Sequence, residues 1–462
     1  MEWDAEVDVI VVGAGGGGAI TALTVAQEGL DVALFEKTDF LLGNTAASAG
    51  MIPACGTRFQ KDLQIADSID IMTNDILKKN HFESNAKQVQ ALASISGPLV
   101  EWMNDDLKIE MSVVTEFKYP GHSSFRMHAP PSRSGLELMK KLKKRILEHE
   151  NIYLLLNSTF NELITDGEKV LGIKVKTPDG EQCIKGRAVV IATNGFGGNK
   201  EMVNQYIPEI ADALYFGYEA NEGEGIQAGI KIGAMTSSLT AYQGHAAVNE
   251  QTGLLVTWGT IMMGGFYINL QGQRFANEAQ GYSEFAKEVL KQEGQKGYIV
   301  YDQNIHNKLL SIEDYKQINE MEAYKKANTI KELAQLIQVN PNTLSNTMDT
   351  YLNQTEGVAD IFGRNSFGEK LRAPYYAIKV SPALFHTQGG LSINTNAQVI
   401  NTEGEEIPNL YAVGGSAVGV SGNHAYGYMS GNGLLAALGF GRIAGLNIIS
   451  NLVANKEEVI ND

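Results

Sequence analysis

The sequence predicts an α/β fold, and three features that follow one another near its start carry the prediction. A run of β-forming residues, 7–12, leads into Gly13-Ala14-Gly15-Gly16-Gly17-Gly18 and then into an apolar helical segment, 19–26. A second short strand, 31–35, ends at Glu36. Glycines at this spacing allow a tight turn, close approach of the backbone to a pyrophosphate and close packing of helix on strand. Together these features indicate a Rossmann-like dinucleotide-binding domain.

Length, composition and charge limit the class of protein. A chain of 462 residues with 44% apolar and 19% charged residues is typical of a globular enzyme with more than one domain. A formal net charge of −16 argues against nucleic acid or an anionic membrane as partner. We see no run of about 18 apolar residues and expect no membrane span. Cys55 and Cys183 lack metal-ligand spacing, so we expect no metal site and a cytoplasmic location.

Changes in residue pattern and composition divide the chain into segments. Residues 60–148 carry apolar positions at helical spacing, whereas 152–191 have the pattern of short strands separated by turns. From about residue 246 the sequence becomes more polar, with a helical pattern. After residue 372 the glycine-rich, apolar composition returns. We therefore predict one cofactor-binding domain, residues 1–245 and 373–462, interrupted by an inserted α+β capping domain, residues 246–372.

Three further segments favour a flavin over a nicotinamide as the dinucleotide. Nicotinamide cofactors are mobile and rarely need more chain along them. Here the small polar segment 43–50, the turn 192–195 and the segment 410–415 all offer further close approaches. A helix then starts near Ser430-Gly431-Asn432-Gly433, and a helix N-terminus directed at an isoalloxazine stabilises the anionic reduced form. We therefore expect FAD.

Seven short motifs occur in order along almost the whole chain. They are GAGGGG with Glu36, GNTAASAG at 43–50, ATNGFGG at 192–198, GEG at 223–225, GQRFANE at 272–278, HTQGG at 386–390 and SGNG at 430–433. In kind and order they resemble the flavoproteins of the fumarate reductase and succinate dehydrogenase family. The resemblance implies FAD, a mobile cap, a substrate held between cap and flavin, and chemistry at a C=C bond beside an electron-withdrawing group.

The resemblance also assigns cofactor contacts by position. With the glycine turns, the expected cofactor-binding residues are Gly13, Ala14, Gly15, Gly18, Glu36, Asn44, Thr45, Gly50, Phe160, Ala192, Glu224, Thr387, Gly415, Gly433 and Leu434. Family members that tether FAD use a histidine near the segment that corresponds to Asn44-Thr45, whereas the first histidine here is His81. We therefore expect noncovalent FAD and an external electron donor or acceptor.

The departures from the family pattern concern the substrate. Fumarate reductases hold a dicarboxylate with arginines, one of which is also the proton donor, because a guanidinium grips a carboxylate through two parallel hydrogen bonds. Tyr282 and Tyr428 occupy the two arginine positions here, and Trp258 and Ile261 occupy two proton-relay positions. The family residues that persist are His245, Thr257 and His386. Fumarate is therefore not the expected substrate.

Two tyrosines and a serine make a different kind of site. Neutral hydroxyls donate and accept hydrogen bonds at pH 7, which suits a carbonyl that becomes an enolate. The Tyr428-Met429-Ser430 spacing with Tyr282 resembles the 3-ketosteroid dehydrogenases of this superfamily, especially those that act between C4 and C5. The resemblance implies catalytic roles for Tyr428, Tyr282 and Ser430, and we count His386, expected in the active-site wall, as a fourth catalytic candidate. Capping of the following helix is an alternative role for Ser430.

We therefore expect an FAD-dependent oxidoreductase that adds or removes hydrogen across a C=C bond conjugated to a carbonyl, in a 3-oxo steroid (Δ4 or Δ1) or a similar hydrophobic enone. Tyr428 would hold the carbonyl oxygen, and Tyr282 with Ser430 would relay a proton. An apolar wall is expected from Trp258, Ile261, Met262, Met263 and Phe266. Two alternatives stay open: a reductase of an α,β-unsaturated carboxylate such as fumarate, urocanate or cinnamate, and a non-catalytic FAD electron-transfer subunit.

Overall fold

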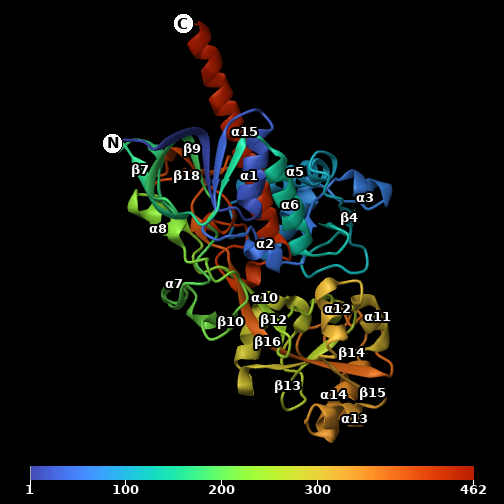
Figure 1. The fold of residues 1–462 in the computed structure, drawn as a ribbon. Helices are drawn as coiled ribbons and strands as arrows, with labels where there is room; N and C mark the ends of the chain where they lie inside the picture. The colour runs from blue at the N-terminus through green and yellow to red at the C-terminus, as the bar shows by residue number, and fades with distance from the viewer. Residues whose placement is uncertain (1, 462) are drawn as a thin grey trace.

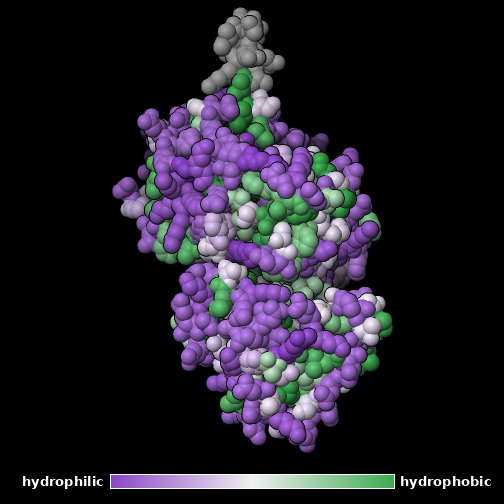
Figure 2. Space-filling model, turned by 90° about the vertical axis from the view of Figure 1, so that its right-hand side faces the viewer, coloured by the Kyte–Doolittle hydropathy of each residue, from purple (hydrophilic) through white to green (hydrophobic). Residues whose placement is uncertain are grey.

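The computed structural model describes residues 2–461. The chain forms two stacked lobes, with its first and last parts mainly in one lobe and its middle part in the other (Figure 1). The lobes meet at a narrow waist, and the visible face of both is mainly hydrophilic with scattered hydrophobic residues (Figure 2).

The first lobe, here called the nucleotide lobe, contains an eight-stranded sheet with the order β18-β19-β9-β1-β2-β6, in which β8 pairs with β9 and β7 with β8. Its strands are β1 (Ala5–Val12), β2 (Val32–Phe35), β6 (Ile152–Leu155), β7 (Thr159–Thr165), β8 (Val170–Thr177), β9 (Gly180–Ile191), β18 (Gln398–Ile400) and β19 (Glu406–Ala412). Strands β1, β2, β6, β9 and β19 are parallel, so their carboxyl ends share one edge, where ligands of such sheets bind.

Helices pack beside this sheet and against one another (Figure 1). They are α1 (Gly16–Ala26), α5 (Ala86–Asp105), α6 (Gly135–Glu148) and α15 (Asn432–Asn461). Every residue of α1 is buried, which explains the largely apolar, glycine-rich sequence of this helix, and the hydroxyls of its two threonines donate to backbone carbonyls one turn back. The sequence prediction of strand, glycine turn, helix and second strand is confirmed, as are the helices and strands expected between residues 60 and 191.

The second lobe, here called the cap lobe, contains a six-stranded sheet in which β16 pairs with β10, β12, β14 and β15, and β14 pairs with β13. Its strands are β10 (Leu214–Tyr215), β12 (Tyr242–Asn249), β13 (Phe266–Asn269), β14 (Gly297–Asp302), β15 (Lys325–Ala327) and β16 (Tyr375–Thr387). Its helices are α9 (Gly259–Met262), α10 (Tyr282–Leu290), α11 (Gln303–Leu309), α12 (Glu313–Glu320), α13 (Ile330–Leu336) and α14 (Pro341–Leu352). The α/β architecture with an inserted α+β cap is confirmed.

The remaining elements lie outside these two groups. They are α2 (Gly43–Ala47), β3 (Ile52–Pro53), α3 (Arg58–Asp62), α4 (Ile69–Lys79), β4 (Ser112–Val113), β5 (Met127–Ala129), α7 (Lys200–Tyr206), η1 (Pro208–Ile210), α8 (Glu224–Lys231), β11 (Thr236–Ser237), η2 (Glu278–Gln280), η3 (Glu293–Gln295), β17 (Gly390–Leu391), η4 (Gly414–Ser416) and η5 (Ala425–Gly427). The predicted boundary at 245/246 falls within β12, and the one at 372/373 falls just before β16. Both strands belong to the cap sheet, and the division into three segments remains a prediction.

Helix α15 differs from one expectation. By length and composition its portion Asn432–Val453 is apolar enough to cross a membrane, whereas the sequence showed us no such segment. This portion is 56% buried within the protein and packs on α1 and α5, as a core helix does.

Candidate active site

A continuous cavity of about 1650 Å³, its open mouth included, runs from the glycine turn of the nucleotide lobe to the junction with the cap lobe. The predicted cofactor residues that line it are Gly13, Gly15, Glu36, Asn44, Thr45, Phe160, Ala192, Glu224, Gly415, Gly433 and Leu434. The predicted catalytic residues Tyr282, His386, Tyr428 and Ser430 line it as well. Residues far apart in the sequence therefore meet in one cavity.

The glycine turn opens on this cavity. Gly13 has a φ of +103°, and a Cβ on it would lie 2.3 Å from the carbonyl oxygen of Ala192. A Cβ on Gly18 would lie 1.9 Å from the carbonyl oxygen of Gly13, so Gly18 allows α1 to pack on β1. Gly15 faces open space and precedes α1 without a side-chain cap. The free N–H groups at the start of α1 therefore favour a phosphate in the cavity.

Four predicted cofactor residues do not line the cavity: Ala14, Gly18, Gly50 and Thr387. The backbone N–H of Ala14 donates to Glu36 Oε2 over 3.1 Å. Thr387 is 1% exposed, and its hydroxyl accepts a hydrogen bond from the backbone N–H of Phe196 over 3.3 Å. Gly50 provides a turn with a φ of +63°. These residues do not face the cavity but hold the segments that form its wall.

Acidic side chains mark the end of the cavity beside the glycine turn. Glu36 Oε1 accepts hydrogen bonds from the backbone and the hydroxyl of Thr38, over 3.1 and 2.9 Å. Lys37, which the sequence analysis missed, forms an ion pair with Glu224. Glu224 Oε2 is buried and has no hydrogen-bond partner among the described residues. An oriented carboxylate, an orphaned acceptor and an open glycine cradle fit the ribose and pyrophosphate of a dinucleotide.

Asn44 lies in the wall, but its side chain is engaged within the protein. Its Oδ1 accepts hydrogen bonds from the backbone N–H of Tyr218 (2.7 Å) and from Asn221 Nδ2 (2.9 Å), and its Nδ2 donates to the carbonyl of Phe385 (3.0 Å). Asn44 therefore ties the nucleotide lobe to β16 of the cap sheet.

The two tyrosines predicted to be catalytic face each other across the lobe junction. Tyr282 begins α10, Tyr428 follows η5, and their ring centroids lie 6.0 Å apart. Burial raises the pKa of Tyr428 to about 12, although the Gly433 N–H, the Tyr282 hydroxyl and the Gly431 N–H oppose the shift. Burial also raises the pKa of Tyr282, and the Ser430 hydroxyl opposes that shift. Both phenols are therefore protonated at neutral pH and able to donate.

Ser430 lies two residues before α15, which begins at Asn432. The position that directly precedes the helix is therefore Gly431, so the alternative role of Ser430 as helix cap does not fit. The carbonyl of Ser430 accepts a hydrogen bond from His122 Nε2 over 3.0 Å. Its hydroxyl faces the Tyr282 phenol.

His386 is held in a chain of polar groups. Its Nε2 donates to Asn194 Oδ1 over 2.8 Å, and its Nδ1 accepts from Gln388 Nε2 over 2.7 Å. The orientation of the Gln388 amide is fixed by Ser421, whose hydroxyl donates to Gln388 Oε1 over 3.0 Å. Burial lowers the pKa of His386 to about 4, so the ring is neutral near pH 7. With both nitrogens engaged, His386 serves as cavity wall rather than as a proton donor.

Aromatic rings enclose the reactive end of the cavity. The ring of His245 stacks on Tyr282 and on Phe385, with ring centroids 4.5 and 5.1 Å apart, and is perpendicular to Trp258, with centroids 5.8 Å apart. Burial lowers the pKa of His245 to about 3, and its Nδ1 accepts from the backbone N–H of Ala247. This histidine is therefore neutral and part of an apolar box.

The predicted apolar wall is only partly correct. Trp258 lines the cavity, but Ile261, Met262, Met263 and Phe266 do not, because they pack within or against the core of the cap lobe. Wall residues that the sequence analysis missed are Met51, Tyr119, Met127, Phe216, Gln243, Leu255 and Phe385. They lie on strands and loops with no motif of their own. Tyr119 hydrogen-bonds Thr257 over 3.2 Å, and its ring meets that of Tyr282 edge-on.

The charge of the cavity is confined to one end. The charged residues among those that line it are Glu36, Lys37 and Glu224, all beside the glycine turn, and no lining residue is an arginine. At the other end, the polar groups are hydroxyls, amides and neutral histidines.

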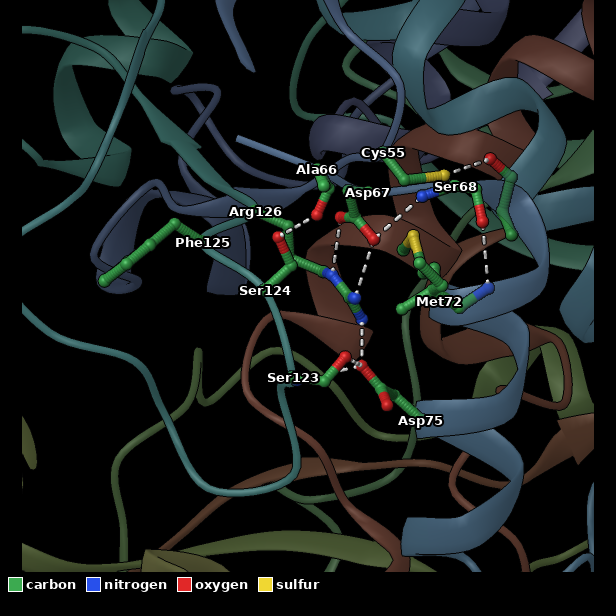
Figure 3. A network of polar contacts seen from close by, with 12 residues as sticks. Cys55, Ala66, Asp67, Ser68, Met72, Asp75, Ser123, Ser124, Phe125 and Arg126 are labelled. Carbon is green, nitrogen blue, oxygen red and sulfur yellow. Dashed lines mark hydrogen bonds and ion pairs between the residues drawn. The ribbon is translucent and has the colours of Figure 1, made fainter. Parts of the chain in front are cut away.

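A buried ion-pair network anchors the loop that carries Tyr119 and His122. Arg126, whose side chain is fully buried, donates to Asp67 through Nε (3.0 Å) and Nη2 (2.9 Å), and its Nη1 lies 2.8 Å from Asp75 Oδ2. Figure 3 shows the guanidinium between the two carboxylates. Asp75 also accepts hydrogen bonds from Ser123, within the same loop. The network therefore holds the loop that carries Tyr119 and His122 in place.

Comparison with known proteins agrees with this geometry. The model of the FAD binding domain family matches residues 8–434. A probable fumarate reductase of Shewanella frigidimarina is 31% identical over 95% of this chain and 74% of that protein. The chain belongs to this FAD-binding family of fumarate reductase flavoproteins. The cofactor is therefore FAD, and the protein is an FAD-dependent oxidoreductase.

Two solved structures of this fold are similar along nearly the whole chain. The open conformation of a flavocytochrome c3 fumarate reductase is 29% identical with a TM-score of 0.80, covering 97% of this chain and 79% of that one. The 3-ketosteroid-Δ4-(5α)-dehydrogenase of Rhodococcus jostii RHA1, in complex with 4-androstene-3,17-dione, is 23% identical with a TM-score of 0.77, covering 97% and 98%.

Proposed function

We propose that this flavoprotein reduces the C=C bond of a neutral, hydrophobic enone, with a 3-oxo steroid as the best candidate. The observation that carries the proposal is the reactive end of the cavity, where hydroxyls stand at the two positions at which the family resemblance implies arginines. A dicarboxylate placed there would lose its bidentate partners, whereas a ketone oxygen needs only hydrogen-bond donors.

The protein groups fit the reducing direction. FAD held between the glycine turn and Glu36 would, when reduced, supply the hydride chemistry for the β-carbon of the substrate. The Tyr428 phenol, with its raised pKa, stays protonated and donates to the carbonyl oxygen as enolate charge develops. Tyr282 donates the proton that reaches the α-carbon, and Ser430 relays a replacement proton from solvent to Tyr282. The neutral box around His245 excludes water from the reacting carbons.

A reductase of an α,β-unsaturated carboxylate is the second candidate, because the similarity to fumarate reductases extends over 95% of the chain. His245, Thr257 and His386 also stand in the cavity, but none of them is cationic at pH 7. A single carboxylate would therefore be held by hydrogen bonds alone.

We also propose that FAD is bound noncovalently, that an external partner exchanges electrons with it, and that the protein works in the cytoplasm. The histidines that line the cavity, His245 and His386, stand at its substrate end. Acid precipitation should therefore release FAD from the chain.

Anaerobic bleaching tests catalysis itself. Purified protein is reduced with dithionite until its yellow colour is lost, and a 3-oxo-4-ene steroid is then added. Return of the oxidised flavin spectrum with formation of saturated ketone supports the proposal. A spectrum that returns only with oxygen or a redox protein would instead identify an electron-transfer subunit.

A further inference from the structure

The end of helix α4 links the nucleotide lobe to the helix that carries Tyr282. Lys79, the last residue of α4, donates to the carbonyl of Gln280 over 2.9 Å and forms an ion pair with Glu284 at 2.5 Å. The two charged side chains are only 12% and 13% exposed. The other carboxylate oxygen of Glu284 is buried without a hydrogen-bond partner among the described residues. Among the described residues, Lys79 is thus the polar partner of this carboxylate.

The residue after Lys79 holds the segment that carries the second tyrosine. Asn80 is fully buried, and its Nδ2 donates to the carbonyl of Val420 over 3.0 Å. A Cβ on Gly427, directly before Tyr428, would lie 2.9 Å from the Asn80 Cβ. Two consecutive residues at the end of α4 therefore contact the two segments from which the facing tyrosines project.

Within its own lobe, the first turn of α10 is tied to β12 by Ser283, whose hydroxyl accepts from the Gly244 N–H over 3.0 Å and donates to the Tyr242 carbonyl over 3.3 Å. Lys79 adds the contact from the nucleotide lobe. Gly281, which precedes Tyr282, has a φ of +145° and caps the helix with no side-chain hydrogen bond. Glycine in this region is conformationally permissive, so the direction in which Tyr282 leaves the chain is weakly set by local structure. Lys79 contacts this turn on both sides of Tyr282, because it donates to the carbonyl of Gln280 and pairs with the carboxylate of Glu284.

We propose that Lys79 is a positioning residue that latches the cap lobe onto the nucleotide lobe and sets the Tyr282 hydroxyl against Tyr428. The role of Tyr282 as proton donor rests on the proposed function, whereas the latch itself does not.

The test uses the holoenzyme with Lys79→Gln, Tyr282→Phe and the double variant. Anaerobic reoxidation of the reduced flavin by an enone should slow about 10- to 100-fold in Lys79→Gln, because small misplacements of a reacting group are costly. Since Lys79 acts through Tyr282, the double variant should be no slower than Tyr282→Phe alone. Hydrogen exchange of residues 279–290 should rise in Lys79→Gln without any substrate.

Lys287→Gln is the matched control. Lys287 lies on the same helix and pairs with Glu209, and its side chain is 34% exposed. This variant should keep the parent rate. The proposal would be overturned if the rate losses of the two single variants multiplied in the Lys79→Gln/Tyr282→Phe double variant. Unchanged hydrogen exchange of residues 279–290 in Lys79→Gln would also overturn it. If the parent reoxidises with a carboxylate and ignores every enone, the proposed function fails, and the same double variant, assayed with that carboxylate, still tests the latch.

Discussion

At the scale of single residues, the Tyr428 hydroxyl should decide the rate. Tyr428→Phe keeps the ring packed but removes the group that meets the developing negative charge. We expect turnover of a 3-oxo-4-ene steroid to fall by about 10²–10³, with FAD content unchanged. Steady-state kinetics and the flavin spectrum measure both quantities. Tyr153→Phe, at a half-exposed position on β6, is the control; a Tyr428→Phe enzyme as fast as the control would exclude the hydroxyl mechanism.

Glu36 should govern retention of the cofactor. Its carboxylate is held by Ala14 and Thr38 and lines the cavity, where it would accept hydrogen bonds from the ribose hydroxyls of FAD. Glu36→Ala should weaken FAD binding by about 1.5–3 kcal/mol, the usual contribution of a charged hydrogen bond. Fluorescence titration of apoprotein with FAD measures the change. The exposed Glu28→Ala is the control, and equal FAD affinities for the two variants would contradict this role.

Single residues were predictable where a motif fixed their geometry. Glu36 and Gly15 follow from the spacing of the first strand, turn and helix, and Tyr428 follows from its place before SGNG. Tyr119 gave no comparable signal, because a loop far away in the sequence brings it to the site and the buried Arg126 network fixes that loop. The error over Phe266 has a simple cause: apolar composition does not distinguish a cavity wall from a lobe core.

At the scale of elements, the start of α15 separates two roles of Ser430. Since α15 begins at Asn432, Ser430→Ala should leave the free energy of unfolding within about 0.5 kcal/mol of the parent, less than the roughly 1 kcal/mol typical of a lost cap. Turnover should nevertheless fall, because Tyr282 loses its neighbouring hydroxyl. Denaturant unfolding and kinetics on the same preparation measure both effects. A variant with lower stability and parent turnover would restore the capping role.

The elements themselves were predictable to different degrees. The nucleotide lobe combines buried strands with glycine turns at functional spacing, so its sequence pattern is strong. The cap sheet was not foreseen in the same detail, because β16 lies beyond the expected cap boundary and returns to pair with β12 and β14. Pairings between such distant strands leave no local signal.

At the scale of the whole molecule, buried histidines in both lobes should make the free energy of unfolding depend on pH in the acidic range. Burial lowers the pKa values of His122 and His245 to about 3 and those of His128 and His386 to about 4. Between pH 6.5 and 4 the unfolded chain therefore binds more protons than the folded one.

Stability should consequently be retained above pH 6.5 and fall as the pH drops toward 4, by up to about 1.4 kcal/mol per pH unit for each such histidine. Thermal unfolding from pH 8 to 4 measures the trend. His128 does not itself line the cavity. In His128→Gln, the slope of unfolding free energy against pH should decrease at pH 5 by the contribution of about one proton. An identical slope in parent and variant would contradict the lowered pKa of His128.

The substrate preference of the whole enzyme follows from a cavity whose charge lies at one end only. The most direct measurement is the second-order rate of anaerobic flavin reoxidation by a 3-oxo-4-ene steroid relative to fumarate, on one batch of dithionite-reduced holoenzyme. We predict that the steroid reacts faster by at least about 100-fold, because a carboxylate would be left without a cationic partner. Rapid reoxidation by fumarate, with no response to any enone, would contradict the proposed function.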